Sequence, residues 1–120
     1  MNTVVVNPGL VTPRAVNQGD IWLVSLDPTV GSEIQKTRPC LILSPREMND
    51  YVRTVLIAPL TSGSRPVSFR VPVRHGGKEG LILLDQIRSV DRSRLVKCSG
   101  PVDSKTLTAV LSILRAVFEE

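Results

Sequence analysis

The spacing of apolar residues changes once along this chain, and the change limits what the chain can fold into. Before residue 100, Val, Ile and Leu gather in short runs bounded by Pro, Gly, Asn or Asp, which is typical of β-strands. The predicted strands cover residues 21–26, 39–43, 54–60, 68–73, 81–84, 86–90 and 95–99. From Leu107 to Phe118 the apolar residues instead recur at helical spacing, which predicts one amphipathic helix with Asp103 as its N-cap.

The predicted strands are joined by short connections, and this pattern points to one architecture. Many short strands closed by one terminal helix indicate a small, strongly bent sheet or partial barrel with the helix packed on it. An alternating parallel α/β fold is disfavoured. The run Ser44-Pro45-Arg46-Glu47 predicts a short internal helix, with serine as N-cap, proline at the first helical position and the acid in the first turn, and a simple turn is the alternative.

Length and composition bound the class of protein. A chain of 120 residues with 42% apolar content can form one core without cross-links or metals. Pro8, Gly9 and Pro13 predict a loosely held extension over residues 1–17, which could add an edge strand, and residues 18–120 are expected to form a single domain. With no secretory leader and no apolar run long enough for a membrane span, we expect a cytoplasmic protein.

The sequence contains few of the residues and motifs on which most enzymes depend. Its sole histidine, His75, lies in a Gly-rich hairpin tip and is expected to be a solvated turn residue. Cys40 and Cys98 are too few for a zinc site and are expected to be buried thiols. No phosphate loop, serine elbow or metal-ligand spacing is present in the sequence. This pattern disfavours most cofactor enzymes, and we expect no cofactor and no metal.

Cleavage of RNA is a reaction that needs no cofactor, because the ribose 2′-hydroxyl is a built-in nucleophile. The formal charge of +4 is compatible with a polyanionic partner. Arg38 could stabilise charge on the phosphate, and the hydroxyl of Thr61, at the end of a predicted strand, could donate to a phosphate oxygen. From spacing alone, structural roles are favoured: an ion pair for Arg38, with Glu33 as the nearby acid, and a cap of the following turn for Thr61.

A series of short motifs changes this balance. In order, these are Gly19–Trp22, Asp27–Pro28, Gly31–Glu33, Arg38–Pro39, Leu43–Pro45, Ala58–Thr61 and Leu84–Arg88. Together they resemble the MazF/PemK family of toxin ribonucleases from Asn17 to Glu120. The resemblance implies a compact SH3-like, MazF/CcdB-like barrel with a C-terminal helix. It also implies a homodimer that cuts single-stranded RNA such as mRNA at short motifs without a metal, leaving 2′,3′-cyclic phosphate and 5′-hydroxyl ends.

Motif by motif, the resemblance assigns the catalytic arginine to Arg38, the catalytic threonine to Thr61 and the acid of the Gly-Ser-Glu motif to Glu33. Some members of the family carry a histidine before the arginine, where this chain has Thr37. The identity of the general base is therefore left open. Glu33 either accepts the 2′-hydroxyl proton or orients Arg38, and orientation is favoured.

Further polar residues are candidates for RNA binding. Ser32, Lys36 and Arg65 lie on the two loops expected to flank the cleft, and they either contact phosphates or bases or are ordinary solvated loop residues. Gln86 either contacts RNA or is a buried amide that ties strands together. The expected partners are single-stranded RNA, a cognate antitoxin whose acidic flexible segment occupies the cleft, and a second copy of the chain, with no membrane.

Two other classes of function stay open. The fold expected from the resemblance also resembles the CcdB gyrase poisons, which bind a protein and cut nothing. Those toxins depend on a C-terminal Trp-Gly-Ile ending, which this chain does not have at Val117–Glu120. The second alternative is a non-catalytic RNA-binding barrel, which a cleavage assay would distinguish from an endoribonuclease.

Overall fold

The computed structural model describes residues 15–34 and 36–120. Most of the predicted N-terminal extension, residues 1–14, lies outside the described residues. Within the described part of the chain, no helix is long and apolar enough to cross a membrane.

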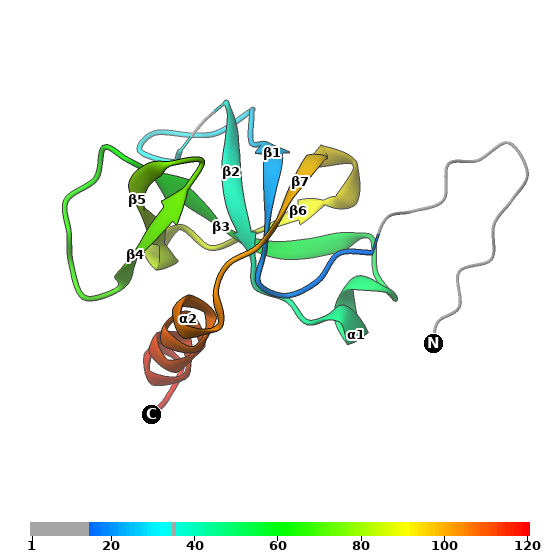
Figure 1. The fold of residues 1–120 in the computed structure, drawn as a ribbon. Coiled ribbons are helices and arrows are strands. Elements are labelled where there is room, and N and C mark those ends of the chain that lie inside the picture. Colours follow the sequence, from blue (N-terminus) through cyan, green and yellow to red (C-terminus); the bar gives the residue numbers. More distant parts are fainter. Residues whose placement is uncertain (1–14, 35) are drawn as a thin grey trace, which may run out of the picture.

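In the described part of the chain, seven antiparallel strands form one strongly curled sheet, and the C-terminal helix packs beneath it (Figure 1). The order along the sheet is β4-β5-β3-β2-β1-β7, and β6 pairs with β3 off this path. The strands are β1 (Asp20–Ser25), β2 (Thr37–Ile42), β3 (Thr54–Thr61), β4 (Arg70–His75), β5 (Lys78–Leu83), β6 (Arg88–Asp91) and β7 (Leu95–Pro101). The predicted mainly β fold, with a bent antiparallel sheet and two helices, is confirmed.

The longest strand, β3, joins the two halves of the sheet. Its first half pairs with β6, from Thr54 opposite Asp91 to Ile57 opposite Arg88, while Ile57–Pro59 also pair with β2. Its last two residues, Leu60 and Thr61, pair with β5 instead. The sheet therefore bends where β3 passes from one set of partners to the other, and the end of β3 lies between β2 and the β4–β5 hairpin.

The β4–β5 hairpin turns at Gly76 and Gly77, whose φ angles are 59° and 77°. Positive φ at both central residues is the mark of a type I′ turn, whose twist matches that of the flanking strands. Pro72 lies in β4 at the edge of the sheet, as predicted from its lack of an N–H donor. Strand β4 begins and ends later than predicted, so His75 is its last residue rather than part of the tip.

Residues 15–34 and 36–120 contain two α-helices, as predicted, and two 3₁₀ turns, η1 (Leu84–Gln86) and η2 (Arg92–Arg94), which flank β6. In α1 (Arg46–Asn49) the N-cap is Pro45, not Ser44 as predicted. The Ser44 hydroxyl instead donates to Asn49 Oδ1 at 2.6 Å and accepts from the Leu56 N–H at 3.0 Å. The serine is used to hold the helix against β3, so it is unavailable as a cap.

The C-terminal helix α2 (Ser104–Val117) begins where the sequence predicts. The Asp103 carboxylate accepts from the Thr106 N–H at 2.8 Å. Hydrogen bonding from the side chain and then the backbone of Thr106 lowers the pKa of Asp103. Val110 is the buried residue of the helix and joins a core that includes Leu41, Leu60 and Ile82. A helix-period apolar stripe therefore docks α2 on one face of the sheet, nearest β4.

The opposite face of the central strands carries a second core. Trp22, Cys40 and Ile57 belong to it, whereas their neighbours Ile21, Leu41 and Ala58 belong to the first core. This alternation follows from the period of two along a strand. Val16 also packs into the second core, with 1% of its surface exposed.

Candidate functional site

Arg38 and Thr61 lie on adjacent strands at the same end of the sheet. Strands β2 and β3 pair with Cys40 opposite Pro59 and Leu41 opposite Ala58. Continued along both strands, this register sets Arg38 opposite Thr61. Both residues line one cavity, so the two side chains that phosphate chemistry singles out in the sequence are brought together.

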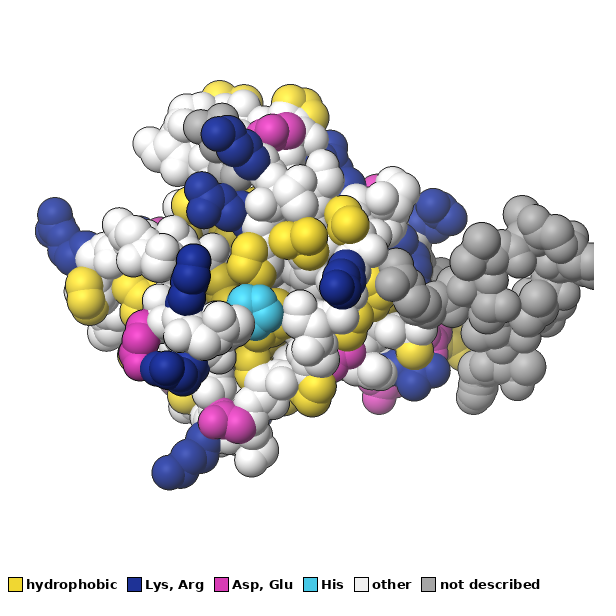
Figure 2. Space-filling view, turned by 45° about the horizontal axis from the view of Figure 1, so that its top comes forward, with side chains coloured by type: hydrophobic (Ala, Val, Ile, Leu, Met, Phe, Trp, Pro, Cys, Tyr) yellow, Lys and Arg dark blue, Asp and Glu magenta, His cyan; other side chains and the backbone are white. Residues whose placement is uncertain are grey.

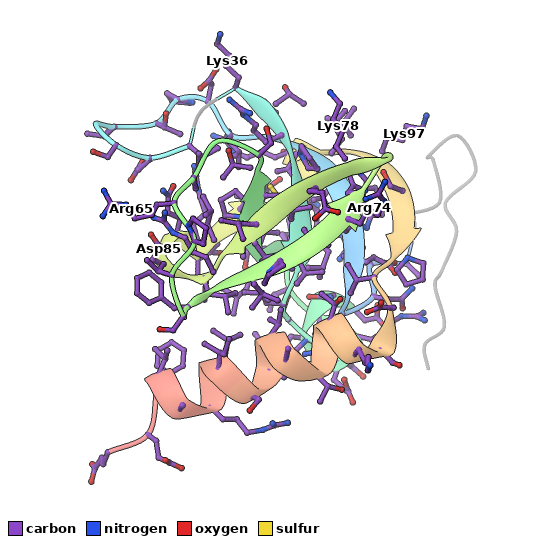
Figure 3. All side chains as sticks on the ribbon, turned by 60° about the vertical axis from the view of Figure 1, so that its left-hand side comes forward. Lys36, Arg65, Arg74, Lys78, Asp85 and Lys97 are labelled. Atoms are coloured by element: carbon purple, nitrogen blue, oxygen red, sulfur yellow. The ribbon has the colours of Figure 1, made fainter. Side chains whose placement is uncertain are left out.

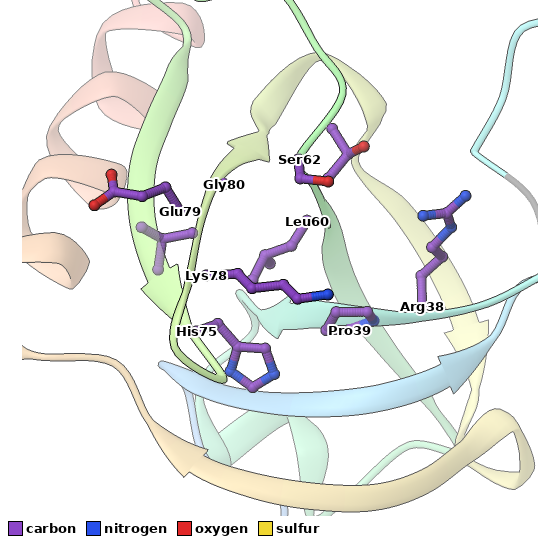
Figure 4. Close-up of a pocket in the computed structure, with 10 residues that line it drawn as sticks. Arg38, Pro39, Leu60, Ser62, His75, Lys78, Glu79 and Gly80 are labelled. Carbon is purple, nitrogen blue, oxygen red and sulfur yellow. The ribbon is translucent and has the colours of Figure 1, made fainter.

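This first cavity has a volume of about 150 Å³. Figure 4 shows it between β2, the end of β3 and the β4–β5 hairpin. Its lining residues are Arg38, Pro39, Leu60, Thr61, Ser62, Val73, His75, Lys78, Glu79 and Gly80. Buried Leu60 and Val73 give it an apolar side, while three cationic or imidazole groups lie around it. Such a hollow suits a polyanion that must be partly desolvated.

The hydroxyl of Thr61 is also used within the fold. Its Oγ1 accepts a hydrogen bond from the Gly63 N–H at 3.3 Å, which is the turn-capping role that the sequence left open. This bond occupies an acceptor lone pair, and the hydroxyl hydrogen is a separate donor. Thr61 can therefore cap its turn and donate to a phosphate oxygen at the same time.

The structure does not bring Glu33 into the cavity of Arg38 and Thr61. Glu33 is exposed on the β1–β2 loop, where its Oε1 accepts from the Val30 N–H at 2.8 Å. It lines a second cavity of about 180 Å³ with Leu26, Ile34, Pro59, Asp85, Gln86, Ile87 and Arg88. Its predicted catalytic part, as a base or as a positioning group for Arg38, stays a prediction.

Gln86 fastens the loop that carries Glu33. Its side-chain Oε1 accepts from the Ile34 N–H at 2.9 Å across 52 residues of sequence. Gln86 is half-buried and lines the second cavity. This contact corresponds to the tying role that the sequence left open, while the amide N–H₂ of Gln86 remains a candidate donor to RNA.

Ser32, Lys36 and Arg65 are exposed on the two loops that were expected to flank the site. Figure 3 shows Lys36 and Arg65 projecting from different loops toward solvent. Lys36 has a φ of 69°, and its N–H donates to Asp27 Oδ1 at 2.8 Å, which fixes the loop backbone before β2. None of the three lines the first cavity, so RNA contact by these residues stays a prediction for the flanking surface.

Two arginines fix the start of the β1–β2 loop. Arg88 Nη1 donates to the Leu26 carbonyl oxygen at 3.1 Å, and Arg94 Nη1 donates to the Ser25 carbonyl oxygen at 2.9 Å. Both donors come from the η1–β7 segment, far away in sequence. The loop that leads to Arg38 is therefore anchored to the sheet at its first residues.

His75 and Lys78 are site residues that sequence reasoning missed. The sequence indicated a solvated turn for His75, but this residue is half-buried and lines the cavity of Arg38 and Thr61. In the space-filling view of Figure 2, the imidazole lies on one face of the molecule with basic side chains around it. The sequence contained a signal for this position. The Gly76-Gly77 pair predicts a two-residue hairpin turn, which places His75 and Lys78 opposite each other as the last residue of one strand and the first of the next.

Among the described residues, Glu79 is the one acid that lines the first cavity, and it already has a partner. Glu79 Oε2 lies 2.8 Å from Arg74 Nη1, and both side chains are exposed. In Figure 4 the Glu79 carboxylate points away from the cavity, whereas the Lys78 ammonium extends across it toward Pro39. The cavity thus presents positive charge to a bound group.

An ion pair stands beside the second cavity. Asp85 accepts from Arg70 Nη2 at 2.9 Å and from Arg70 Nε at 3.1 Å, a two-point contact between η1 and β4. The hydrogen bond from Arg70 lowers the pKa of Asp85.

Among the residues that the structure describes, no three His, Cys, Asp or Glu side chains are grouped as metal ligands would be.

Comparison with known proteins gives a consistent result. Residues 17–118 match a family described as PemK-like, MazF-like toxin of type II toxin-antitoxin system. Endoribonuclease PemK of Escherichia coli is 42% identical over 81 residues, which cover 63% of this chain and 61% of that protein. The aligned part is thus less than two thirds of PemK. Endoribonuclease toxin MazF of Escherichia coli strain K12 is 33% identical over 102 residues, which cover 84% of this chain and 92% of that protein.

Solved structures show the same architecture. A crystal structure of MazF from Deinococcus radiodurans superimposes with a TM-score of 0.78 at 27% identity, covering 88% of this chain and 97% of that one. In a crystal structure of MazE-MazF from the same organism, the matched chain gives a TM-score of 0.71 at 25% identity, covering 88% and 96%. The predicted MazF-like fold is confirmed.

Proposed function

The chain belongs to the family of PemK-like and MazF-like toxins of type II toxin-antitoxin systems, and from this premise we propose that it is an endoribonuclease. It cleaves single-stranded RNA such as mRNA at short sequence motifs, without a metal, and leaves 2′,3′-cyclic phosphate and 5′-hydroxyl ends. The observation that carries this proposal is the meeting of Arg38 and Thr61 in one cavity. The names of the relatives, endoribonuclease PemK and endoribonuclease toxin MazF, support it.

In this mechanism the ribose 2′-oxygen attacks the neighbouring phosphorus and the 5′-oxygen leaves. The Arg38 guanidinium donates two hydrogen bonds to the non-bridging oxygens, where negative charge develops in the transition state. The Thr61 hydroxyl donates a further hydrogen bond. Because these donors sit on paired strands, they are held in place before the substrate binds, and little reorganisation is needed.

The test is a cleavage assay in EDTA with a long transcript of mixed sequence. Wild-type protein should generate defined 5′-hydroxyl ends, and mapping those ends gives the sequence motif directly. Arg38→Ala should lower the rate by at least ~10²-fold while the protein stays folded. Undiminished cleavage by Arg38→Ala would overturn the site, and RNA binding without cleavage by the wild type would identify an RNA-binding barrel instead.

The cognate antitoxin is proposed as the partner that neutralises the toxin. The MazE-MazF crystal structure of Deinococcus radiodurans supports a partner of this kind. Exposed cations on the loops around the first cavity, Lys36 and Arg65, suit an acidic flexible segment that competes with RNA. A short acidic peptide from such a partner should inhibit cleavage, and added salt should weaken the inhibition.

The cytoplasm is the proposed location, because mRNA is the proposed substrate.

A second copy of the chain is the other proposed partner. An apolar groove of about 610 Å³ runs between α2 and the sheet and is lined by Gln18, Leu43, Leu56, Ile87, Leu111, Leu114, Arg115 and Phe118. Leu56 is 36% and Phe118 78% exposed, so the groove leaves large apolar side chains open to solvent in the single chain. An isologous dimer would cover the same patch on both copies.

A further inference from the structure

We propose that His75 is the general acid of the proposed cleavage and protonates the 5′-oxygen as it leaves the phosphorus. The inference rests on the proposed endoribonuclease function and adds a catalytic residue to it. In some family members a histidine precedes the catalytic arginine, but this chain has Thr37 there. Its single histidine reaches the site from a different strand.

The paired strands of the β4–β5 hairpin hold His75 in place at the cavity. The β4–β5 ladder runs without interruption from Arg70 opposite Leu83 to His75 opposite Lys78. Close packing of the hairpin on β3 is possible because Gly80 has no side chain: a Cβ there would lie 3.0 Å from the Thr61 carbonyl oxygen. The end of the hairpin therefore stands beside Thr61, and His75 is half-buried in the cavity wall.

The geometry separates His75 from the charge-stabilising groups. Figure 4 shows Arg38 and His75 on different sides of the cavity, with Pro39 and the Lys78 ammonium between them. In a displacement at phosphorus the attacking and leaving oxygens lie roughly in line, on opposite sides of the phosphorus. A cavity with donors on one wall and an acid on another can contact the non-bridging oxygens and a bridging oxygen of one phosphate.

The charges around the imidazole suit a proton donor to a polyanion. The charged groups that line the cavity with His75 are Arg38 from β2 and Lys78 and Glu79 from β5. The Glu79 carboxylate is turned toward Arg74, the neighbour of His75 on β4. Arg38 and Lys78 would therefore hold the phosphate in the cavity beside the imidazole of His75.

The chemistry balances without a further reactant. A bond forms between the 2′-oxygen and phosphorus, the bond between phosphorus and the 5′-oxygen breaks, and the 2′-hydroxyl proton passes to water. The imidazolium gives its proton to the 5′-oxygen and is reprotonated by solvent. Guanidinium and ammonium groups hold their protons too tightly for this step at neutral pH, whereas imidazole is the side chain that exchanges protons there.

The decisive experiment compares two substrates. One is an RNA with the ordinary 5′-oxygen at the cut, and the other carries a bridging sulfur there, which leaves as a thiolate without needing a proton. His75→Ala should lower kcat on the oxygen substrate by roughly 10²- to 10⁴-fold. On the sulfur substrate the same variant should cleave within about tenfold of the wild type, because the missing acid is no longer needed.

Three outcomes would overturn the proposal. Wild-type rates of His75→Ala on the oxygen substrate would show that no proton comes from His75. Equal losses on both substrates would assign His75 to base catalysis or to binding. A wild-type protein that cuts neither substrate would overturn the endoribonuclease function as well. If the wild type is active, Arg38→Ala is inactive and His75→Ala cleaves like the wild type, the role of His75 alone is overturned.

Matched variants separate the acid from a merely structural role. Lys78→Gln removes a cation from the same cavity and should raise KM, with no rescue by sulfur. His75→Gln keeps a polar side chain of similar size, and should show the same sulfur rescue as His75→Ala while circular dichroism confirms its fold.

Discussion

Gly80 lies against the end of β3 so closely that a Cβ at this position would be 3.0 Å from the carbonyl oxygen of Thr61. The neighbour is backbone, which cannot rotate away as a flexible side chain would. The contact explains how the β4–β5 hairpin approaches the site, because a Cβ at this distance would be tighter than an ordinary contact and the backbone of Thr61 would have to shift. A substitution there tests whether the position of Thr61 matters for catalysis.

Gly80→Ala should displace the end of β3 by a few tenths of an ångström and lower kcat by on the order of tenfold, because small misplacements of catalytic groups are costly. Overpacking should also lower the free energy of unfolding by about 1–3 kcal/mol. Steady-state kinetics and urea unfolding measure the two effects. Gly63→Ala is the control for stability, since a Cβ there meets no atom within 4 Å. A Gly80→Ala protein with wild-type kcat would show that the contact is unimportant for the reaction.

Two substitutions should separate the contribution of the Thr61 hydroxyl to catalysis from that of the side chain's packing. Thr61→Val keeps the volume but removes the donor, and should lower kcat by about 10²- to 10³-fold, as expected for a lost transition-state hydrogen bond. Thr61→Ser keeps the hydroxyl and should stay within roughly tenfold of the wild type. Single-turnover cleavage of one RNA measures both rates. Equal losses in the two variants would point to packing rather than to hydrogen bonding.

The fold was predictable because its signals are local. Short apolar runs bounded by Pro and Gly identify the strands, and the helical spacing after Asp103 identifies α2. That Arg38 and Thr61 lie at the same end of the sheet also follows from strand order, since β2 and β3 are neighbouring antiparallel strands. In such cases residues close in sequence, or on consecutive strands, determine the outcome.

The rest of the site depends on how the sheet bends, which no local pattern encodes. His75 enters the cavity only because β3 switches partners and brings the β4–β5 hairpin beside β2. Glu33 is directed to another cavity because its loop is held by Gln86, 52 residues away. The prediction of Ser44 as an N-cap was wrong for a similar reason. Its hydroxyl donates to Asn49 Oδ1 and accepts from the N–H of Leu56, which lies on another element.

The ion pair of Arg70 and Asp85 should make stability depend on pH in the acid range. The pKa of Asp85 is lowered by its hydrogen bond with Arg70, so its contribution is complete above the unfolded-state pKa of about 4 and is lost as pH falls through the lower folded-state value. Asp85→Asn should therefore be less stable than the wild type at pH 7, and the difference should shrink below about pH 4. Urea unfolding at several pH values measures it. A difference that is constant with pH would contradict the role of charge.

The two free cysteines should differ in reactivity. Cys40 is fully buried, and burial raises the pKa of its thiol to about 12, so almost no thiolate forms at pH 8. Cys98 is half-buried in β7. Iodoacetamide at pH 8 should therefore label Cys98 first, and mass spectrometry of the digested protein locates the label. Labelling of both in urea is the control, and rapid labelling of Cys40 in the folded protein would contradict its burial.

Leu56→Asp should disrupt the proposed dimer. Leu56 lines the apolar groove beside α2 and is 36% exposed in the single chain, so a second copy would bury a carboxylate there without a partner. The cost of burying an unpaired charge is several kcal/mol, which should weaken dimerisation by on the order of 100-fold or more. Light scattering should then report the 13.1 kDa of one chain at concentrations where the wild type shows twice that mass. Val96→Asp, at an apolar residue that is 50% exposed outside the groove, should leave the dimer intact. A dimeric Leu56→Asp protein would place the interface on another face.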